Sequence, residues 1–435
     1  MSGHQSLGLL FRYDRPPMSA SDSVSVSWPS LFVPTYDGHL PPLNLRNSAG
    51  IEAVDSSELF TMYVCGITPY DATHLGHAAT YISFDLINRY MRASGSTVRF
   101  VENITDIDEP LLERAHRDNV DWIALAESQI DLFRSDMTAL HVLPPDSFVP
   151  ATSVMELIDR AISRMTENGF VYRVENDLYF DSSSFHKDLP VTMEEALATF
   201  GERGGDPDRV GKKHPLDPVL WWANKDDEPG WASSHGFGRP GWHIECSVIA
   251  LRYLIGADYL ESSTGDFAID LQGGGSDLIF PHHFMSGAQA KAILGKPFAR
   301  RYVHTGMVGL DGEKMSKSKG NLVFVSTLLK DGVDPVVIRY ALLKDHYQSD
   351  RMWSNSSLDQ ARESVAKIRS ALSREYVRAT DSVENQIIAA LANNLDTPSA
   401  LSALEAWAQE VDAQPHQKGT GALSRLLDGF MGLAF

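Results

Sequence analysis

Residues 61–77 read TMYVCGITPYDATHLGH, and this stretch decides the fold. Residues 61–64 form a short apolar run, which is typical of a buried parallel strand, and turn-forming residues follow over 66–73. From residue 76 the apolar positions recur at helical spacing, and residues 97–101 read as a second strand. A strand, a glycine-containing loop, a helix and a second strand together indicate a βαβ unit.

Strands and helices continue to alternate along the chain, which predicts an α/β fold with a Rossmann-like, doubly wound parallel sheet. The pattern predicts helices near 121–140, 151–168 and 242–254, a hairpin over 171–181, strands over 267–271 and 301–308, and a loop-heavy stretch over 196–241. After residue 321 the signal is almost entirely helical. We therefore divide the chain into a partly loose N-terminal extension (1–58), a catalytic domain (59–330) with an inserted connective segment around 120–230, and a helical bundle domain (331–435).

Composition excludes several classes of protein. The 435 residues include 38 Lys and Arg against 57 Asp and Glu, a net charge of −19, which argues against a protein that binds nucleic acid through bulk electrostatics. Two cysteines exclude a disulfide scaffold. The sequence contains no run of about 18 apolar residues, so it predicts no membrane span. The N-terminal apolar patch is too short for the core of a signal peptide. We expect a cytoplasmic protein.

His74-Leu75-Gly76-His77 lies directly after a predicted strand, at the start of a predicted helix. Backbone N–H groups at a helix N-terminus favour anions, and Gly76 leaves room for a nucleotide to approach. His74 and His77 can donate hydrogen bonds to a phosphate as its charge develops. The alternative is a pair of surface histidines in a loop.

The stretch Lys314-Met315-Ser316-Lys317-Ser318-Lys319-Gly320 places three lysines within six positions. A mobile cationic loop of this kind can hold the β- and γ-phosphates of ATP and stabilise departing pyrophosphate. The alternative is a solvated basic turn.

The two cysteines and a histidine pair offer a third candidate site. Cys65 ends the first strand, Cys246 follows Gly238–Glu245, and the histidines stand in Phe280-Pro281-His282-His283. Two thiolates and one imidazole fit a catalytic zinc with an open fourth position, although free cysteines are more often inert core residues. The nearby glycines 273–275 indicate either a ligand-binding strand end or a tight turn.

Taken together, these motifs resemble the class I aminoacyl-tRNA synthetase superfamily. His74–His77 is similar to its HIGH motif, and residues 314–318 read as a complete KMSKS motif. The chain is more narrowly similar to the cysteinyl-tRNA synthetase branch through 62–66, 103–108, 238–246 and 280–283, and the resemblance extends from about 28 to 430.

Two families within that branch compete: cysteinyl-tRNA synthetases, and the ligases that join cysteine to glucosaminyl-inositol in mycothiol biosynthesis. The first loop, Cys65-Gly66-Ile67-Thr68, and Glu202-Arg203-Gly204-Gly205-Asp206-Pro207 resemble the ligases. The short C-terminal part also favours a ligase over a tRNA-charging enzyme. The resemblance implies activation of L-cysteine by ATP, with Mg²⁺, to cysteinyl-adenylate. Amide formation with glucosaminyl-inositol would then release AMP. We expect a monomer that uses no tRNA.

The resemblance also implies roles for individual residues. Catalytic roles fall to His74, His77, Lys314 and Lys317. Zn²⁺ would be held by Cys65, Cys246 and His282. The residues that would contact the substrate and the adenylate are Cys65, Gly66, Ile67, Thr68, Thr80, Asn103, Ile104, Thr105, Trp242, Gly275, Ser276, Asp277 and Val308. One departure stands out, because Phe284 follows the histidine pair where these families have a glutamate, and Ser286 occupies the place of a fourth zinc ligand in the tRNA enzymes.

Overall fold

A computed structural model gives the fold. It describes residues 27–47, 50–54, 56–224, 228–261, 265–315, 319–409 and 417–435. Among these residues, no helix combines the length and the apolar character needed to cross a membrane.

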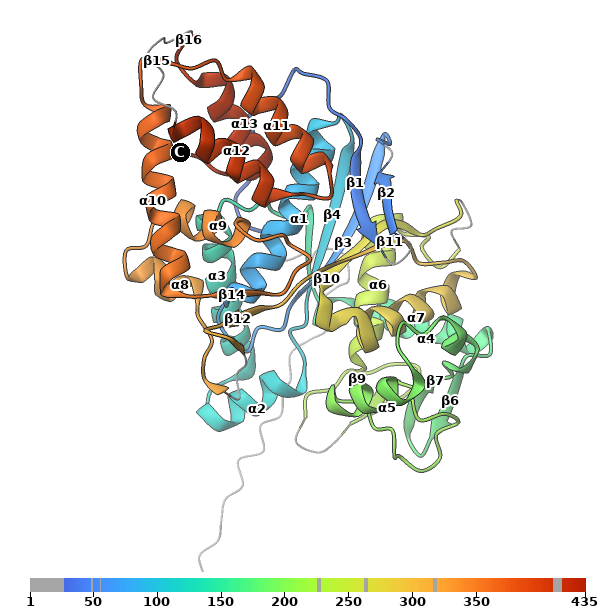
Figure 1. Cartoon of the computed structure of the whole chain (residues 1–435). Coiled ribbons are helices and arrows are strands. Elements are labelled where there is room, and N and C mark those ends of the chain that lie inside the picture. The colour runs from blue at the N-terminus through green and yellow to red at the C-terminus, as the bar shows by residue number, and fades with distance from the viewer. Residues whose placement is uncertain are drawn as a thin grey trace, which may run out of the picture.

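The centre of the molecule is a five-stranded parallel sheet, which confirms the predicted fold class (Figure 1). Its strands, in spatial order, are β11 (Ala299–Thr305), β10 (Ile269–Gly275), β3 (Leu59–Ile67), β4 (Thr97–Ile104) and β5 (Ser147–Pro150). From β3 the chain proceeds to β4 and β5 on one side, and later to β10 and β11 on the other. The topological switch point, where such sheets bind ligands, therefore lies between β3 and β10.

Each face of the sheet carries its own hydrophobic core. Along β3, Phe60, Met62 and Val64 join one core while Tyr63 and Cys65 join the other, because successive side chains of a strand point to opposite faces. The first core contains α1 (Leu75–Ala93) and α3 (Trp122–Ala139). The second contains α4 (Met155–Glu167), α6 (Trp242–Ile255) and α7 (Phe284–Leu294).

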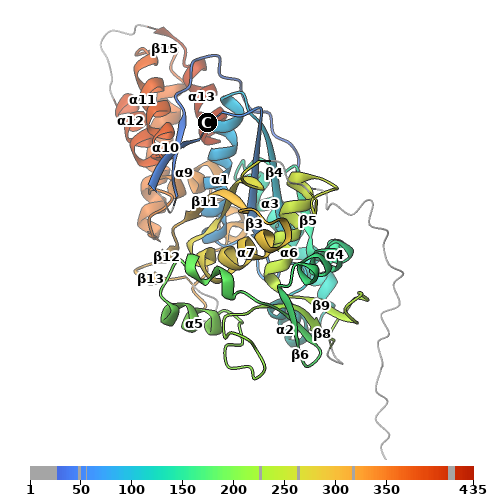
Figure 2. The same ribbon diagram turned by 90° about the vertical axis from the view of Figure 1, so that its right-hand side faces the viewer.

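An antiparallel sheet follows β5 in the chain and lies beside the carboxyl end of the parallel sheet (Figures 1 and 2). Its strands are β6 (Val171–Val174), β7 (Asp177–Phe180), β8 (Val219–Ala223) and β9 (Gly238–Pro240). The hairpin predicted over 171–181 is confirmed. The stretch predicted as loop-heavy, 196–241, is mostly turns and loops in its described residues, and it also contains β8, β9 and most of α5 (Met193–Glu202). The start of α5 is fixed by a capping box of Thr192 and Glu195.

The N-terminal region is more ordered than predicted. β1 (Leu43–Asn47) and β2 (Gly50–Val54) form an antiparallel hairpin, and Trp28 is buried with its indole N–H donating to the Val142 carbonyl at 2.8 Å. Serine and proline content predicts loose chain, but the apolar side chains of this region complete the first core. The beginning of the chain, up to residue 26, lies outside the described residues.

The C-terminal part is mostly helical, as predicted. Its helices are α8 (Val325–Lys330), α9 (Pro335–Leu343), α10 (Asn355–Leu372), α11 (Asp381–Ala392), α12 (Thr397–Gln409) and α13 (Gly421–Met431). The short strand β14 (Arg351–Trp353) pairs in parallel with β12 (Val308–Leu310), which also pairs with β13 (Glu313–Lys314). The remaining elements are α2 (Glu109–Asp118), β15 (Tyr376–Val377) and β16 (Gln417–Lys418). This arrangement attaches the helical part directly to the strands that follow the parallel sheet.

Candidate active site

The predicted site residues come from strand ends that meet at the switch point. Cys65 lies two residues before the end of β3, Thr105 follows β4, and Gly275 ends β10. β3 and β10 are neighbours, with Gly273 opposite Val64. The triple glycine is therefore part of a strand and not a tight turn.

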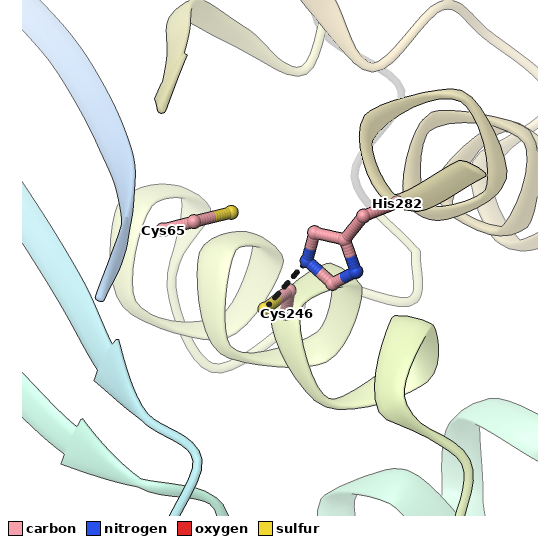
Figure 3. A group of neighbouring side chains, drawn as sticks. All are labelled: Cys65, Cys246 and His282. Carbon is pink, nitrogen blue, oxygen red and sulfur yellow. Dashed lines mark hydrogen bonds between the residues drawn. The ribbon is translucent and has the colours of Figure 1, made fainter. Parts of the chain in front are cut away.

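Three of the predicted residues form a compact buried cluster. The sulfur atoms of Cys65 and Cys246 and a ring nitrogen of His282 all lie within 4.8 Å of one another, and both cysteines are free thiols (Figure 3). The Nε2 of His282 is 3.3 Å from the Cys246 sulfur. Cys65 comes from β3, Cys246 from α6, and His282 from the turn that precedes α7. The fold thus brings together three side chains that are distant in sequence.

Other side chains hold the ring of His282 in place. Its Nδ1 lies 2.9 Å from Nδ1 of His243, which stands one helical turn before Cys246. Trp242 stacks on the His282 ring, with ring centroids 4.1 Å apart and an interplanar angle of 24°. A metal-bound histidine commonly has its second nitrogen engaged in this way. The predicted place of Trp242 at the site is therefore a wall against His282.

The chemistry of this donor set fits a zinc ion. All three residues are buried, and burial raises the pKa of the Cys65 thiol well above its usual range, with Cys246 beside it raising it further. Two thiolates buried side by side would need a cation to balance their charge, and Cys₂His with an open position is a known catalytic zinc arrangement.

Sequence reasoning missed two further histidines at the site. Nε2 of His283 lies 3.2 Å from the Cys65 sulfur, and its Nδ1 lies 2.8 Å from Nε2 of His304 on β11. Gly274 permits this approach, because a Cβ there would be 2.9 Å from the His283 ring. His304 pairs in register with Gly274 across the sheet, so knowledge of the strand register would have revealed it.

The second part of the site surrounds the start of α1. His74 is the N-cap residue, and its Nδ1 accepts from the backbone N–H groups of Gly76 at 3.1 Å and of His77 at 3.4 Å. This bonding leaves the proton of the neutral ring on Nε2. Burial, with the nearby charge of His77, lowers the pKa of His74 to about 3, and burial lowers the pKa of His77 to about 4. Both rings are therefore neutral near pH 7.

The first loop is fixed by Asn103. Its Oδ1 accepts from the Gly66 N–H at 2.8 Å and from the Tyr63 hydroxyl at 2.9 Å, and its Nδ2 donates to the Thr105 hydroxyl at 3.0 Å. Gly66 is needed because a Cβ there would lie 1.7 Å from the Asn103 carbonyl oxygen. The structure thus ties the Asn103 side chain to the protein, where it positions Gly66.

The other predicted contacts are distributed around this loop. Thr80 bonds the Thr305 hydroxyl at 2.9 Å, which links α1 to the end of β11. Ile67 and Ile104 are buried core residues, so only their backbone can face a ligand, whereas Thr68 is half-buried. Ser276 and Asp277 form a short turn after β10 and are accessible, and Val308 is buried in β12.

The two predicted lysines are only partly described. The backbone of Lys314 lies in β13, paired with Gly309 of β12. Lys317 lies outside the described residues.

Comparison with known proteins agrees with this geometry. Residues 52–363 match the family model described as the catalytic domain of class I (C) tRNA synthetases. Among solved structures, methionyl-tRNA synthetase of Mycobacterium tuberculosis in complex with methionyl-adenylate has a TM-score of 0.57 at 18% identity, covering 87% of this chain and 89% of its own. A LeuRS of Agrobacterium radiobacter K84, solved as a ternary complex, has a TM-score of 0.62 at 12% identity, covering 86% of this chain and 84% of its own. These likenesses concern the fold.

Sequence relatives are much more similar. The L-cysteine:1D-myo-inositol 2-amino-2-deoxy-alpha-D-glucopyranoside ligase of Nakamurella multipartita is 51% identical over 394 residues, which cover 88% of this chain and 94% of the relative. The ligase of the same name from Gordonia bronchialis is 49% identical, over 88% of this chain and 93% of the relative. The chain belongs to this family of cysteine ligases, within the class I aminoacyl-tRNA synthetase superfamily.

Proposed function

We propose that this enzyme activates L-cysteine with ATP and joins it through an amide bond to the amine of glucosaminyl-inositol, the step that its relatives are named for. The observation that carries the proposal is the buried Cys65, Cys246 and His282 cluster at the switch point of a chain about half identical to those ligases. The product would be cysteinyl glucosaminyl-inositol, the precursor that mycothiol biosynthesis requires.

The cluster would select cysteine over serine. A Zn²⁺ ion bound there would supply an open coordination position for the substrate thiolate. Pocket shape alone discriminates poorly between residues that differ by a single atom. Trp242 and His243 would contribute by fixing the ring of His282, since a ligand that cannot rotate keeps the thiolate position well defined.

Adenylate formation would take place at the start of α1. The cysteine carboxylate attacks the α-phosphate of ATP, and pyrophosphate leaves. The neutral His74 ring, whose proton is on Nε2, would donate to the phosphate without adding a fixed charge. His77 would act beside it, and Lys314 and Lys317 would stabilise the departing pyrophosphate with Mg²⁺.

The amine of the sugar would then attack the acyl carbon of the adenylate, and AMP would leave. An amide forms, so the neutral amine is the reactive species and its proton passes to a base or to solvent. Gly66 and Thr68, in the loop that Asn103 holds, would line the adenylate, with Thr80, Gly275, Ser276, Asp277 and Val308 around it. We further propose that the enzyme acts as a cytoplasmic monomer.

A paired acceptor assay tests this function. The enzyme is supplied with ATP and cysteine, and AMP formation is compared with glucosaminyl-inositol and with bulk tRNA as acceptors. We expect turnover with the sugar amine alone. Turnover with tRNA alone would show that the enzyme is a cysteinyl-tRNA synthetase. Pyrophosphate exchange is not informative here, because both activities include cysteine activation.

A further inference from the structure

The inserted segment contacts the loop that carries His282, and Arg203 makes a hydrogen bond across that contact. We infer that Arg203, at the end of α5, is a positioning residue for the metal site. It would hold the backbone that leads into His282 and so fix the third ligand. This inference rests on the proposed zinc site.

The direct contact is a hydrogen bond from Nη1 of Arg203 to the carbonyl oxygen of Phe280, at 2.7 Å. Phe280 is buried and precedes His282 by two residues. A guanidinium bonded to a carbonyl is a charge-assisted hydrogen bond, which is stronger than a neutral one. The contact therefore restrains the backbone immediately before the ligand.

A separate apolar cluster supports the same loop. Ala196 and Phe200 of α5 pack with Leu216, Phe280 and Met285, and Phe284 packs against them from a half-buried position. Phe284 stands where the resemblance leads one to expect a glutamate. The structure explains the departure, because the side chain at this position meets the apolar face of α5.

The sequence element Glu202–Pro207 fixes Arg203 itself. The Arg203 N–H donates to the Thr199 carbonyl at 3.1 Å, and the Gly205 N–H donates to the Phe200 carbonyl at 2.8 Å. Gly204 has a φ of +83°, the left-handed conformation that ends many helices and that glycine adopts without strain.

The far end of this element is anchored as well. Lys212 donates to the Asp206 carboxylate at 2.8 Å and to the Pro215 carbonyl at 2.7 Å, and the Tyr179 hydroxyl bonds the same carboxylate. The turn that presents Arg203 is therefore held at both ends.

The expected consequence follows from how His282 is oriented. His243 and Trp242 constrain its ring, but both belong to α6 and neither fixes the backbone of the 280–283 turn. Without Arg203 this backbone has a wider range of positions, so the ring nitrogen meets the metal less often at bonding distance.

The test is the Arg203→Ala variant of the full-length enzyme loaded with one zinc per chain. We expect zinc release to a chelator about 10- to 100-fold faster than from the wild type, the range typical for loss of an outer-shell partner. The cobalt-substituted protein should show a weakened or shifted thiolate-to-cobalt absorption. The KM for cysteine should rise while the KM for ATP stays within about twofold.

Two further variants separate positioning from a loss of folding. Arg203→Lys keeps a cationic donor and should restore part of the zinc retention. Arg173→Ala is the matched control, because Arg173 lies in β6 of the same segment and its Nη1 also donates to a backbone carbonyl, that of Asn176, at 2.8 Å. It should leave zinc release and the cobalt spectrum as in the wild type.

If Arg203→Ala releases zinc as slowly as the wild type with an unchanged cobalt spectrum, the positioning role is overturned. Equal effects in Arg203→Ala and Arg173→Ala also overturn it, since they indicate general loosening of the segment. A wild-type protein that binds no zinc overturns the proposed metal site together with this role.

Discussion

Two buried polar clusters lie on opposite faces of the parallel sheet, and they differ in how completely the protein satisfies them. On the α1 face, the Asp85 carboxylate accepts from Arg89 at 2.7 Å, from Arg339, and from the Leu143 N–H at 2.9 Å. On the α6 face, Cys65, Cys246 and His282 contact one another, two neighbouring imidazoles and the ring of Trp242. The charges of the first set are paired within the protein, whereas the second set offers three donor atoms of the kind that bind zinc.

The guanidinium groups of the first cluster are also saturated. Arg89 donates to the carbonyls of His141 and Asp428, and Arg339 donates to those of Leu140 and Met431. They thereby join α1 and α9 to the residues that follow α3 and to α13. We conclude that the first cluster, whose charges are paired within the protein, serves the fold, while the second offers ligand atoms that could hold a metal ion.

Cys246→Ser should distinguish the two clusters most clearly, because it should affect zinc binding and not stability. Serine is a poor zinc ligand, so we expect loss of zinc and a fall of more than about 100-fold in cysteine-dependent pyrophosphate exchange. Zinc content and exchange rate are measured on the same preparation. The free energy of unfolding of the metal-free protein should change by less than about 1 kcal/mol. Full zinc occupancy with normal exchange would contradict the assignment of the site.

Asp85→Asn should instead lower the stability and leave the zinc content unchanged. Burial raises the pKa of Asp85, but Arg89 and Arg339 outweigh it and hold that pKa below its usual value, so the group is charged. Removing the charge leaves two buried guanidinium groups without their counterion, which should cost about 3–5 kcal/mol of stability in urea unfolding. Zinc stoichiometry should stay at the wild-type level.

The matched control for this prediction is Asp359→Asn. Asp359 also pairs with an arginine, Arg362 at 2.8 Å, but its side chain is 67% exposed. An exposed ion pair contributes little, so we expect a change within about 0.5 kcal/mol. Similar losses of stability in both variants would show that the buried cluster stabilises the fold no more than an exposed ion pair does.

The sequence predicted those helices and strands that a local pattern of residues specifies. The βαβ unit, the helices over 242–254 and after 321, and the hairpin over 171–181 follow from hydrophobic period and turn residues. The hairpin β1–β2 and the strands β8 and β9 were missed because each is short, and tertiary contacts rather than propensity stabilise them.

The sequence likewise identified only some of the residues of the candidate site. Resemblance identified Cys65, Cys246 and His282, and the fold brings them together. His283 and His304 were not assigned, since their meeting depends on the register between β10 and β11, which no local pattern encodes. Likewise, no motif in the sequence reports that Arg203 reaches the Phe280 carbonyl.

A smaller effect is expected for Gly66→Ala, which tests how tightly the first loop is packed. A Cβ at this position would lie 1.7 Å from the Asn103 carbonyl oxygen, and that atom belongs to the backbone. The strands must separate, which should cost about 1–3 kcal/mol in urea unfolding. Gly201→Ala is the control, because its Cβ would find its nearest neighbour, Pro207, at 3.4 Å. Equal stability of both variants would show that the loop is free to shift.

The last prediction concerns the pH dependence of stability, where the effect of a single pH step is small. Burial lowers the pKa of His77 from 6.5 to about 4, so between these values the unfolded chain binds a proton that the folded protein does not. The free energy of unfolding therefore rises with pH through this window. The contribution of His77 to it is lost as the pH falls from 6.5 towards 4. His77→Gln should reduce that slope by up to about 1.4 kcal/mol per pH unit.

Urea unfolding at several pH values between 4 and 7 measures this slope. His116→Gln, on the exposed surface of α2, is the matched control and should leave the slope as in the wild type. An unchanged slope in His77→Gln would mean that His77 takes up its proton in the folded state as readily as in the unfolded chain. It would then be a cation near pH 6, and its proposed role as a neutral donor beside His74 would have to be abandoned.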